Sequence, residues 1–191
     1  MYKRGTFAPD SLPEFAANPS DRCYHCKKAI FSTFLALARE RHIPWLADGT
    51  NSDDLQQHRP GQRAVTELGV RSPFTEAGLA KEEIRLLSRA LGLSTWNKPS
   101  ASCLATRIPT HTPITMTNLG LVETAERTLH TLGYHGCRVR LLGTALTIEL
   151  AAGDIARLAG HGDFITVRTY LYSLGAEKVF LDLLERESIL S

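Results

Sequence analysis

The sequence of 191 residues lacks most of the short motifs that assign an enzyme class directly. It contains no HExxH, GxSxG, GxGxxG or GxxxxGK(S/T) segment, so the usual signatures of zinc proteases, α/β-hydrolases, dinucleotide enzymes and Walker-type nucleotidases are missing. It also lacks an apolar run of the ~18 residues that a membrane-spanning helix needs, and its start has no signal-peptide pattern. We therefore expect a cytoplasmic protein.

A large charge of either sign is missing too. The 22 Lys and Arg residues are balanced by 20 Asp and Glu residues, which leaves a formal net charge of +2. Domains that bind nucleic acids usually carry a larger basic excess. Apolar residues make up 43% of the chain and charged residues 22%, which fits a folded protein with a buried core. We therefore expect neither disorder nor a nucleic-acid partner.

Cysteine is scarce, with four residues in the chain. Cys23, Cys26, Cys103 and Cys137 are too few and too unevenly spaced for a disulfide framework, and in a reducing compartment they would stay thiols. The sequence has one CxxC pair and no second pair, so a structural zinc site of the four-cysteine kind is not expected. These cysteines direct attention to metal binding or sulfur chemistry.

The pattern of apolar residues predicts an α/β protein with two domains. Helices are expected over 21–41, 61–68 and 80–91, and a strand over 43–47. After a Pro-rich loop, the order helix, strand, strand, helix, strand is expected at 118–132, 137–142, 145–150, 154–174 and 178–183, which suits a small α+β domain. We place the domains at 1–108 and 109–191.

The CxxC pair, Cys23 and Cys26, lies in the first turn of the first predicted helix. The spacing puts both sulfurs on one face, about one turn apart. The helix start and the adjacent Lys27 and Lys28 would favour the thiolate forms. Such a pair either binds a soft metal, forms a redox couple, or consists of two inert helix thiols.

Cys103 lies in the Pro-rich loop and is the best-placed third sulfur. Three cysteine ligands would leave one metal position open, which suits an iron–sulfur cluster better than a closed zinc site. The alternative is a small buried apolar residue. Arg107, four residues later, would bring a cation near Cys103 or hold an anionic substrate. Cys137 begins a predicted strand and is expected in the core.

An acidic loop follows the predicted strand 43–47. Its sequence from Asp48 to Asp54, DGTNSDD, offers three carboxylates, a hydroxyl and an amide at the end of a strand, where ligands bind in open α/β sheets. These groups suit Mg²⁺ and a nucleotide. The alternative is an Asx-rich turn before a helix.

Arg138 and Arg140 are two residues apart on a predicted strand. Side chains with this spacing lie on the same side of a strand. Paired guanidinium groups suit phosphate or carboxylate recognition. The alternative is a solvated strand face.

Taken together, these segments resemble the LarE-type ATP-dependent sacrificial sulfur transferases of the PP-loop ATP pyrophosphatase superfamily. The resemblance extends over nearly the whole chain and rests on several motifs in the same order. The matching segments are NPSDRCYHCKK at 18–28, DGTNSDD at 48–54, RPG at 59–61, SP at 72–73, EAGL at 76–79, KPS at 98–100, CLATRIP at 103–109, RVR at 138–140, LG at 174–175 and LDL at 181–183.

The resemblance implies a step in the synthesis of the nickel-pincer nucleotide cofactor. ATP and Mg²⁺ would adenylate a carboxylate of pyridinium-3,5-biscarboxylic acid mononucleotide, and sulfur would then replace AMP to give a thiocarboxylate. In one branch of the family the sulfur comes from the cysteine that matches Cys103, which becomes dehydroalanine. In another branch a [4Fe-4S] cluster carries the sulfide, and the presence of Cys23, Cys26 and Cys103 favours this branch.

The resemblance also implies roles for individual residues, a fold and an assembly. The fold would be a partial Rossmann-like domain of the adenine nucleotide alpha hydrolase type, and the protein would be a homo-oligomer. Cys103, Arg107 and Glu126 would be catalytic, and Arg138 and Arg140 would hold the substrate phosphate. Nucleotide and magnesium binding is expected at Asp48, Gly49, Thr50, Asn51, Asp53 and Asp54.

One family motif does not occur in this sequence. The Ser-Gly-Gly-x-Asp-Ser PP-loop, which would bind pyrophosphate through backbone N–H groups, is absent. We therefore expect a chain that is inactive by itself. Three explanations stay open: the start is truncated, a separate chain supplies the loop, or the gene is a degenerate copy. In addition, Thr110 and His111 stand where a Gly-containing turn is expected, and Gly143–Thr147 lacks the expected acidic and basic residues.

Two other functions are compatible with parts of the sequence. A tRNA thiolase of the PP-loop superfamily would use similar adenylation and iron–sulfur chemistry, but the small net charge argues against tRNA. A non-catalytic CxxC metal-binding module would need only Cys23 and Cys26.

Overall fold

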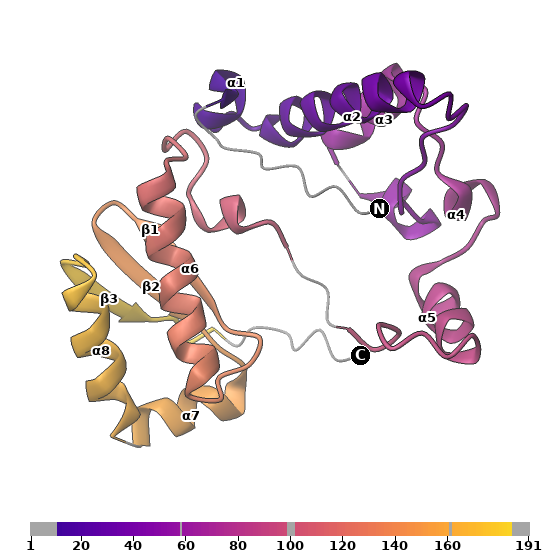
Figure 1. Ribbon diagram of the computed structural model, residues 1–191. Coiled ribbons are helices and arrows are strands. Elements are labelled where there is room, and N and C mark those ends of the chain that lie inside the picture. The colour runs from indigo at the N-terminus through magenta and orange to yellow at the C-terminus, as the bar shows by residue number, and fades with distance from the viewer. Residues whose placement is uncertain (1–10, 58, 99–101, 161, 185–191) are drawn as a thin grey trace. The chain divides into compact units, whose positions relative to one another are not determined.

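The computed structural model of the chain describes residues 11–57, 59–98, 102–160 and 162–184 (Figure 1). The chain divides into two compact units, one over Ser11–Pro99 and one from Ser100 onward. This division falls earlier in the sequence than the boundary expected after residue 108. None of the helices in the described residues combines the length and the apolar character that crossing a membrane requires.

The first unit is built from helices and connecting loops. The structure forms helices over the three ranges where the sequence predicts them. No end of these helices differs from its expected position by more than one residue. The elements are α1 (Pro13–Ala16), α2 (Arg22–Glu40), the 3₁₀ helix η2 (Ser52–Gln56), α3 (Gly61–Glu67), α4 (Pro73–Glu76) and α5 (Lys81–Ala90).

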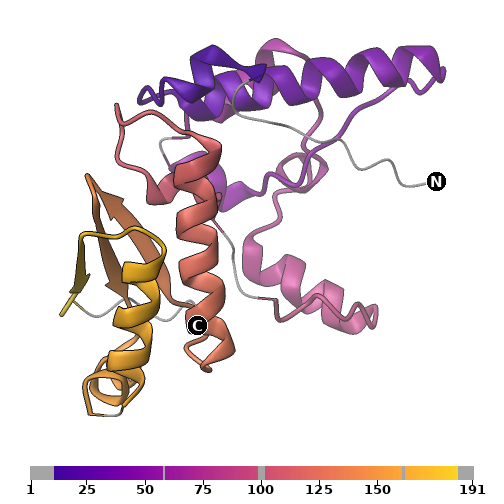
Figure 2. The same ribbon diagram turned by 60° about the vertical axis from the view of Figure 1, so that its left-hand side comes forward.

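Helix α3 lies along α2 in both views of the chain (Figures 1 and 2). Ala64 and Val65 of α3 are buried, with exposed fractions of 0% and 2%. At Gly61, a Cβ atom would lie 2.9 Å from Cδ of Lys27 and 3.3 Å from the carbonyl oxygen of Cys23. Glycine therefore allows the start of α3 to approach the CxxC turn of α2 closely.

The strand expected over 43–47 is reduced to a single parallel bridge between Ala47 and Arg71. The Asp48 N–H donates to the Arg71 carbonyl at 2.8 Å, and the Arg71 N–H donates to the Leu46 carbonyl at 2.9 Å. A strand forms a ladder only where a neighbouring strand continues alongside it. The prediction was therefore too long, and the described residues of this unit do not form a Rossmann-like sheet.

The second unit contains the helix, strand, strand, helix, strand order that the sequence predicts. One difference is that two helices stand where one is expected over 154–174. Gly160 is the last residue of the first helix and Gly162 precedes the second, and glycine has a low helix propensity. The elements are the 3₁₀ helix η3 (Leu104–Arg107), α6 (Met116–Thr131), β1 (Arg138–Leu142), β2 (Ala145–Glu149), α7 (Ala152–Gly160), α8 (Asp163–Ser173) and β3 (Lys178–Leu181).

The three strands of this unit form one sheet in the order β1-β2-β3. Strands β1 and β2 are antiparallel and turn at Gly143, whose φ of 61° suits glycine, while β2 and β3 are parallel. Val139 pairs with Ile148, and both are buried on the face that contributes to the core. The residues that alternate with them lie on the opposite face.

The turn after Pro109 contains a strained residue. His111 has φ of 69°, in the left-handed region that non-glycine residues rarely adopt. This is where the sequence has Thr110-His111 in place of the Gly-containing turn of the resembling family. The backbone therefore adopts a glycine-like conformation without the glycine.

Candidate functional site

Cys103 lies at the start of a short turn in the second unit. It is the residue before η3, and its side chain is exposed to solvent. Its carbonyl oxygen accepts hydrogen bonds from Thr106 N at 2.9 Å and from Thr106 Oγ1 at 2.7 Å. The thiol is thus accessible on a turn that Thr106 closes, and the alternative of a buried apolar Cys103 does not apply.

Arg107, at the other end of this turn, points into the protein. Its Nε and Nη2 donate to the two carboxylate oxygens of Glu126 at 2.6 and 3.2 Å, and the two residues are 7% and 9% exposed. Its Nη1 donates to Ser102 Oγ at 2.6 Å and to Thr106 Oγ1 at 2.9 Å. The guanidinium therefore connects Ser102 and Thr106, which lie before and after Cys103, to Glu126 of helix α6.

Glu126 is also bonded to the sheet. Its Oε1 accepts the backbone N–H of Val139, in strand β1, at 3.0 Å. The carboxylate thus joins α6, β1 and the Cys103 turn through Arg107. The structure brings together Arg107 and Glu126, both expected to be catalytic, but their charges are directed at each other rather than at solvent.

Arg140 reaches the same turn from the sheet. Its Nη1 donates to the Thr106 carbonyl at 3.2 Å, and its Nε donates to Oε1 of Glu149 on β2. Arg138 and Arg140 share one face of β1, as the sequence predicts, and both are half-buried. The arginine face and the Cys103 turn therefore belong to one arrangement.

Three residues of this arrangement were not anticipated from the sequence. Ser102 and Thr106 flank Cys103 and bond to Arg107, and Glu149 bonds to Arg140. A signal for Glu149 was present, because a hairpin turning at Gly143 places it opposite Arg138. Nothing in the local sequence marks Ser102 or Thr106 as partners of Arg107.

The CxxC turn lies in the first unit, at the start of α2. Cys23 is exposed and Cys26 is partly buried, while Tyr24 between them is 8% exposed. Tyr24 Oη donates to Glu67 Oε2 of α3 at 2.7 Å, and the Arg63 guanidinium lies 3.6 Å from the centre of its ring. These contacts fix the turn that presents the two thiols.

The lysines that follow the CxxC pair are engaged with other groups. Lys27 Nζ lies 3.3 Å from Asp48 Oδ2, and Lys28 Nζ lies 2.7 Å from Tyr24 Oη. The hydrogen bond with Tyr24, followed by that with Glu67, raises the pKa of Lys28 above its ordinary value. The ammonium groups of Lys27 and Lys28, expected to act on the two thiols, are thus hydrogen-bonded to Asp48 and Tyr24.

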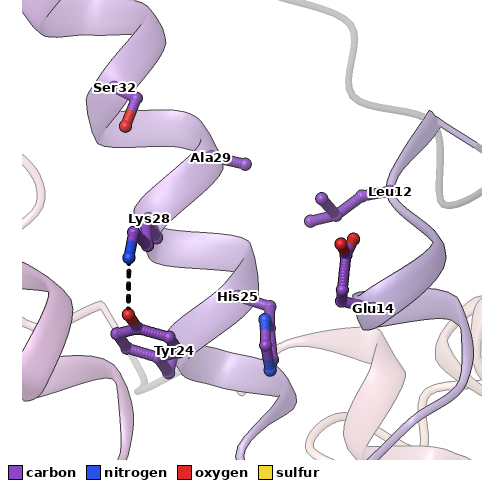
Figure 3. A pocket seen from close by; sticks show the side chains of 7 residues that line it. All are labelled: Leu12, Glu14, Tyr24, His25, Lys28, Ala29 and Ser32. Atoms are coloured by element: carbon purple, nitrogen blue, oxygen red, sulfur yellow. Dashed lines mark hydrogen bonds between the residues drawn. The ribbon is translucent and has the colours of Figure 1, made fainter.

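An open hollow of about 440 Å³ lies beside the same turn (Figure 3). Ala29 and His25 of α2 lie toward Leu12 and Glu14 in this view, whereas Tyr24 and Lys28, which are bonded to each other, lie on the other side of α2. Its lining residues are Leu12, Glu14, Tyr24, His25, Lys28, Ala29 and Ser32.

The carboxylate of Asp48, in the acidic loop, accepts several hydrogen bonds. Oδ1 accepts from Thr50 N at 3.1 Å and from Ser72 Oγ at 2.7 Å, and Oδ2 accepts from Thr50 Oγ1 at 2.6 Å. Burial acts to raise the pKa of Asp48, but the hydrogen bonds from Thr50 and Ser72 and the charge of Lys27 outweigh it, so the pKa lies below its ordinary value.

The other acidic residues of the loop also have protein partners. Asp54 and Asn51 form a reciprocal cap at the start of η2, and Asp54 pairs with Arg59 at 2.8 Å. Asp53 accepts the Lys81 N–H at 2.8 Å. At Gly49, a Cβ atom would meet nothing within 4 Å, so the backbone there is open.

The side chains expected to bind a metal ion belong to different units of the chain or are bonded to protein groups. Within the described ranges, no three His, Cys, Asp or Glu side chains gather as a metal site. The carboxylates of 48–54 are directed at protein donors, which fits the Asx-rich turn better than an Mg²⁺ site. Of the three cysteines predicted to hold a cluster, Cys23 and Cys26 belong to one unit and Cys103 to the other.

Comparisons with known proteins find sequences similar to this chain. No family model matches the sequence. It is 42% identical over 143 residues to an uncharacterized protein of Synechocystis sp., covering 75% of this chain and 53% of the relative. It is 30% identical over 172 residues to an uncharacterized protein of Methanocaldococcus jannaschii, covering 90% of this chain and 66% of the relative.

A third relative carries a functional name. The chain is 35% identical over 170 residues to the pyridinium-3,5-bisthiocarboxylic acid mononucleotide synthase of Lactiplantibacillus plantarum, covering 87% of this chain and 59% of the relative. The chain thus spans about half to two thirds of the length of these curated relatives. This similarity and the ordered motifs support the resemblance to the LarE-type family.

Proposed function

We propose that the chain acts in sulfur transfer to an adenylated carboxylate of a pyridinium dicarboxylate mononucleotide, with Cys103 at the reacting position. The observation that carries the proposal is the exposed Cys103 thiol on a turn held by Arg107 and linked through Thr106 to Arg140. The similarity to the thiocarboxylate synthase supports the choice of substrate.

In the proposed reaction, the Cys103 thiolate attacks the carbonyl carbon of the acyl adenylate. A C–S bond forms, the bond from this carbon to the AMP oxygen breaks, and AMP leaves with the electron pair. Loss of the Cα proton of Cys103 and cleavage of its Cβ–Sγ bond then release the thiocarboxylate and leave dehydroalanine. The elimination is redox-neutral, because the electron pair of the broken Cβ–Sγ bond leaves with sulfur.

Arg107 and Glu126 act in this proposal as positioning residues. Their groups are buried and bonded to each other, so they hold the Cys103 turn in place and do not touch the substrate. Arg138 and Arg140 would bind the phosphate of the mononucleotide, as their half-buried guanidinium groups on one face allow.

A [4Fe-4S] cluster held by Cys23, Cys26 and Cys103 stays a prediction from the sequence. If it formed, it would supply the sulfide in place of the Cys103 sulfur, and Cys103 would end the reaction unchanged. ATP binding and Mg²⁺ binding at Asp48–Asp54, activity that depends on an ATP loop from a separate chain, and homo-oligomer formation are likewise predictions. Because the carboxylates of this loop do not converge, we derive no step through Mg²⁺.

The test uses the chemically prepared acyl adenylate of the pyridinium dicarboxylate mononucleotide, so that it does not depend on ATP activation. Wild-type chain, prepared anaerobically with and without iron and sulfide, is mixed with this adenylate, and thiocarboxylate is measured by mass spectrometry. We expect product from wild type, none from Cys103→Ala, and near wild-type amounts from Cys137→Ala, whose thiol is buried.

The mass of the recovered protein separates the two sources of sulfur. Loss of one H₂S at residue 103 indicates that Cys103 donates its own sulfur, whereas an unchanged mass with bound iron and labile sulfide indicates the cluster. Thiocarboxylate formed equally by wild type and by Cys103→Ala would overturn the proposed role of Cys103.

A further inference from the structure

The two arginines of β1 share their sheet face with a carboxylate of the protein itself. Glu149 is the last residue of β2, and the strand register places it directly opposite Arg138. Its Oε1 accepts a hydrogen bond from Nε of Arg140. The Glu149 side chain is 16% exposed and that of Arg140 is 44% exposed, so the pair lies at the boundary between protein and solvent.

The register brings Glu149 within reach of both arginines. Directly opposed side chains in an antiparallel pair have Cβ atoms about 5 Å apart, and long side chains also reach the diagonal position. Arg138 is the direct neighbour of Glu149, and Arg140 is the diagonal neighbour that bonds to it. The carboxylate therefore lies among the donors that would otherwise be directed at an external anion.

Arg140 keeps donors for such an anion while it holds Glu149. Its Nε is used by Glu149 and one Nη1 donor by the Thr106 carbonyl, out of five N–H donors on a guanidinium. A phosphate monoester carries up to two negative charges and three acceptor oxygens, whereas Glu149 offers one charge. A phosphate group can thus replace the carboxylate as the stronger partner of Arg140.

We propose that Glu149 is an internal competitor for the substrate phosphate, an inference that rests on the phosphate-binding role proposed above for Arg138 and Arg140. Without substrate, the carboxylate neutralises and orients Arg140. When a phosphate monoester binds, Arg140 exchanges Glu149 for the phosphate oxygens, and on release the carboxylate returns. Glu149 therefore weakens phosphate binding and speeds release, so that a mononucleotide product does not remain bound.

The test measures binding of ribose 5-phosphate to the full chain by ¹⁵N NMR, followed at the Thr106 and Thr147 amides and at the arginine Nε–H signals. Glu149→Gln keeps the shape of the side chain and a hydrogen bond to Arg140 but removes the negative charge. We expect Glu149→Gln to bind about fivefold more tightly than wild type, as removal of one partly exposed opposing charge suggests.

Two further variants complete the experiment. Arg140→Gln should lose most of the binding. Glu177→Gln removes an exposed carboxylate that bonds to Thr144 at the opposite end of β2, and it should bind as wild type does.

The outcomes separate this inference from the function on which it rests. Binding that is tighter in Glu149→Gln and unchanged in Glu177→Gln supports the competitor role. Equal or weaker binding by Glu149→Gln overturns it and leaves the phosphate role of the arginines standing. Absence of binding by both wild type and Glu149→Gln overturns the inference together with that phosphate role, while sulfur transfer from Cys103 is judged by its own assay.

Discussion

Arg107 and Glu126 form a two-point ion pair in the interior of the second unit, with Nε and Nη2 of the guanidinium 2.6 and 3.2 Å from the two carboxylate oxygens. Removing one partner of a buried pair leaves the other charge without compensation and costs about 3 kcal/mol. We expect Arg107→Met to lower the free energy of unfolding by about this amount, measured by urea denaturation.

The control for this change is Arg127→Met, which removes an exposed arginine from the same helix as Glu126. Its cost should stay below about 0.5 kcal/mol. The double variant Arg107→Met, Glu126→Leu should be more stable than the sum of the two single changes predicts, because it leaves no charge unpaired. Equal costs at residues 107 and 127 would contradict the buried pair.

The four thiols should differ in their reaction with iodoacetamide. Cys23 and Cys103 are exposed and Cys26 is partly buried, whereas Cys137 is 4% exposed. We expect Cys23 and Cys103 to be alkylated first in the native protein, and Cys137 at least about a hundredfold more slowly, because its reaction requires opening of the core. Peptide mass spectrometry over time measures each rate, and similar rates at Cys137 and Cys103 would contradict the placement of these residues.

Acid should destabilise the protein partly through Asp48. The pKa of this carboxyl is lower in the folded state than its ordinary value of 3.8, despite the opposing effect of burial. The stabilisation is therefore fully present above the unfolded-state pKa and is lost as the pH falls through the folded-state pKa. We expect Tm to fall less steeply for Asp48→Asn than for wild type between about pH 5 and about pH 3.

At neutral pH, Asp48→Asn should itself be less stable by about 1–2 kcal/mol, because charged hydrogen bonds from Thr50 and Ser72 are weakened. Glu123→Gln, at an exposed position on α6, is the control for loss of a carboxylate. Parallel curves of Tm against pH for wild type and Asp48→Asn would count against this assignment.

The turn at His111 offers a stabilising substitution. His111 has φ of 69°, which glycine adopts without a steric penalty. We expect His111→Gly to raise the free energy of unfolding by about 0.5–1 kcal/mol and to raise Tm. Thr110→Gly changes the adjacent residue, which does not have a positive φ, and should lower stability because glycine adds flexibility to the unfolded chain. A loss of stability in both variants would contradict the strained turn.

Much of the secondary structure could be predicted from local patterns. The apolar spacing of Ile30, Phe34, Leu37 and Ala38 predicts α2, and the alternation around Gly143 predicts the β1–β2 hairpin. The strand over 43–47 was predicted too long because a strand depends on a neighbour that its own sequence does not specify. The helix over 154–174 was predicted as continuous although glycine, which has a low helix propensity, occurs at 160 and 162, and the structure has two helices in this range.

The sequence suggests candidate residues for the site but not their contacts. Arg107 was chosen by its spacing from Cys103 and Glu126 through the family resemblance, but their pairing joins residues 19 positions apart and depends on the packing of η3 against α6. The same holds for Arg140 and Thr106, which are 34 positions apart. Contacts of this kind arise from tertiary structure and leave no periodic signal in the sequence.

The hydrogen bond from the Val139 N–H to Glu126 also bears on aggregation. Strand β1 lies at an edge of the sheet, where unpaired backbone donors offer a template for strands of other molecules. Glu126 engages one of these donors with a side chain whose charge is already balanced by Arg107. The pair that holds the Cys103 turn therefore also occupies a backbone donor that could pair with a strand of another molecule. Substitutions at Glu126 should be examined for self-association as well as for loss of activity.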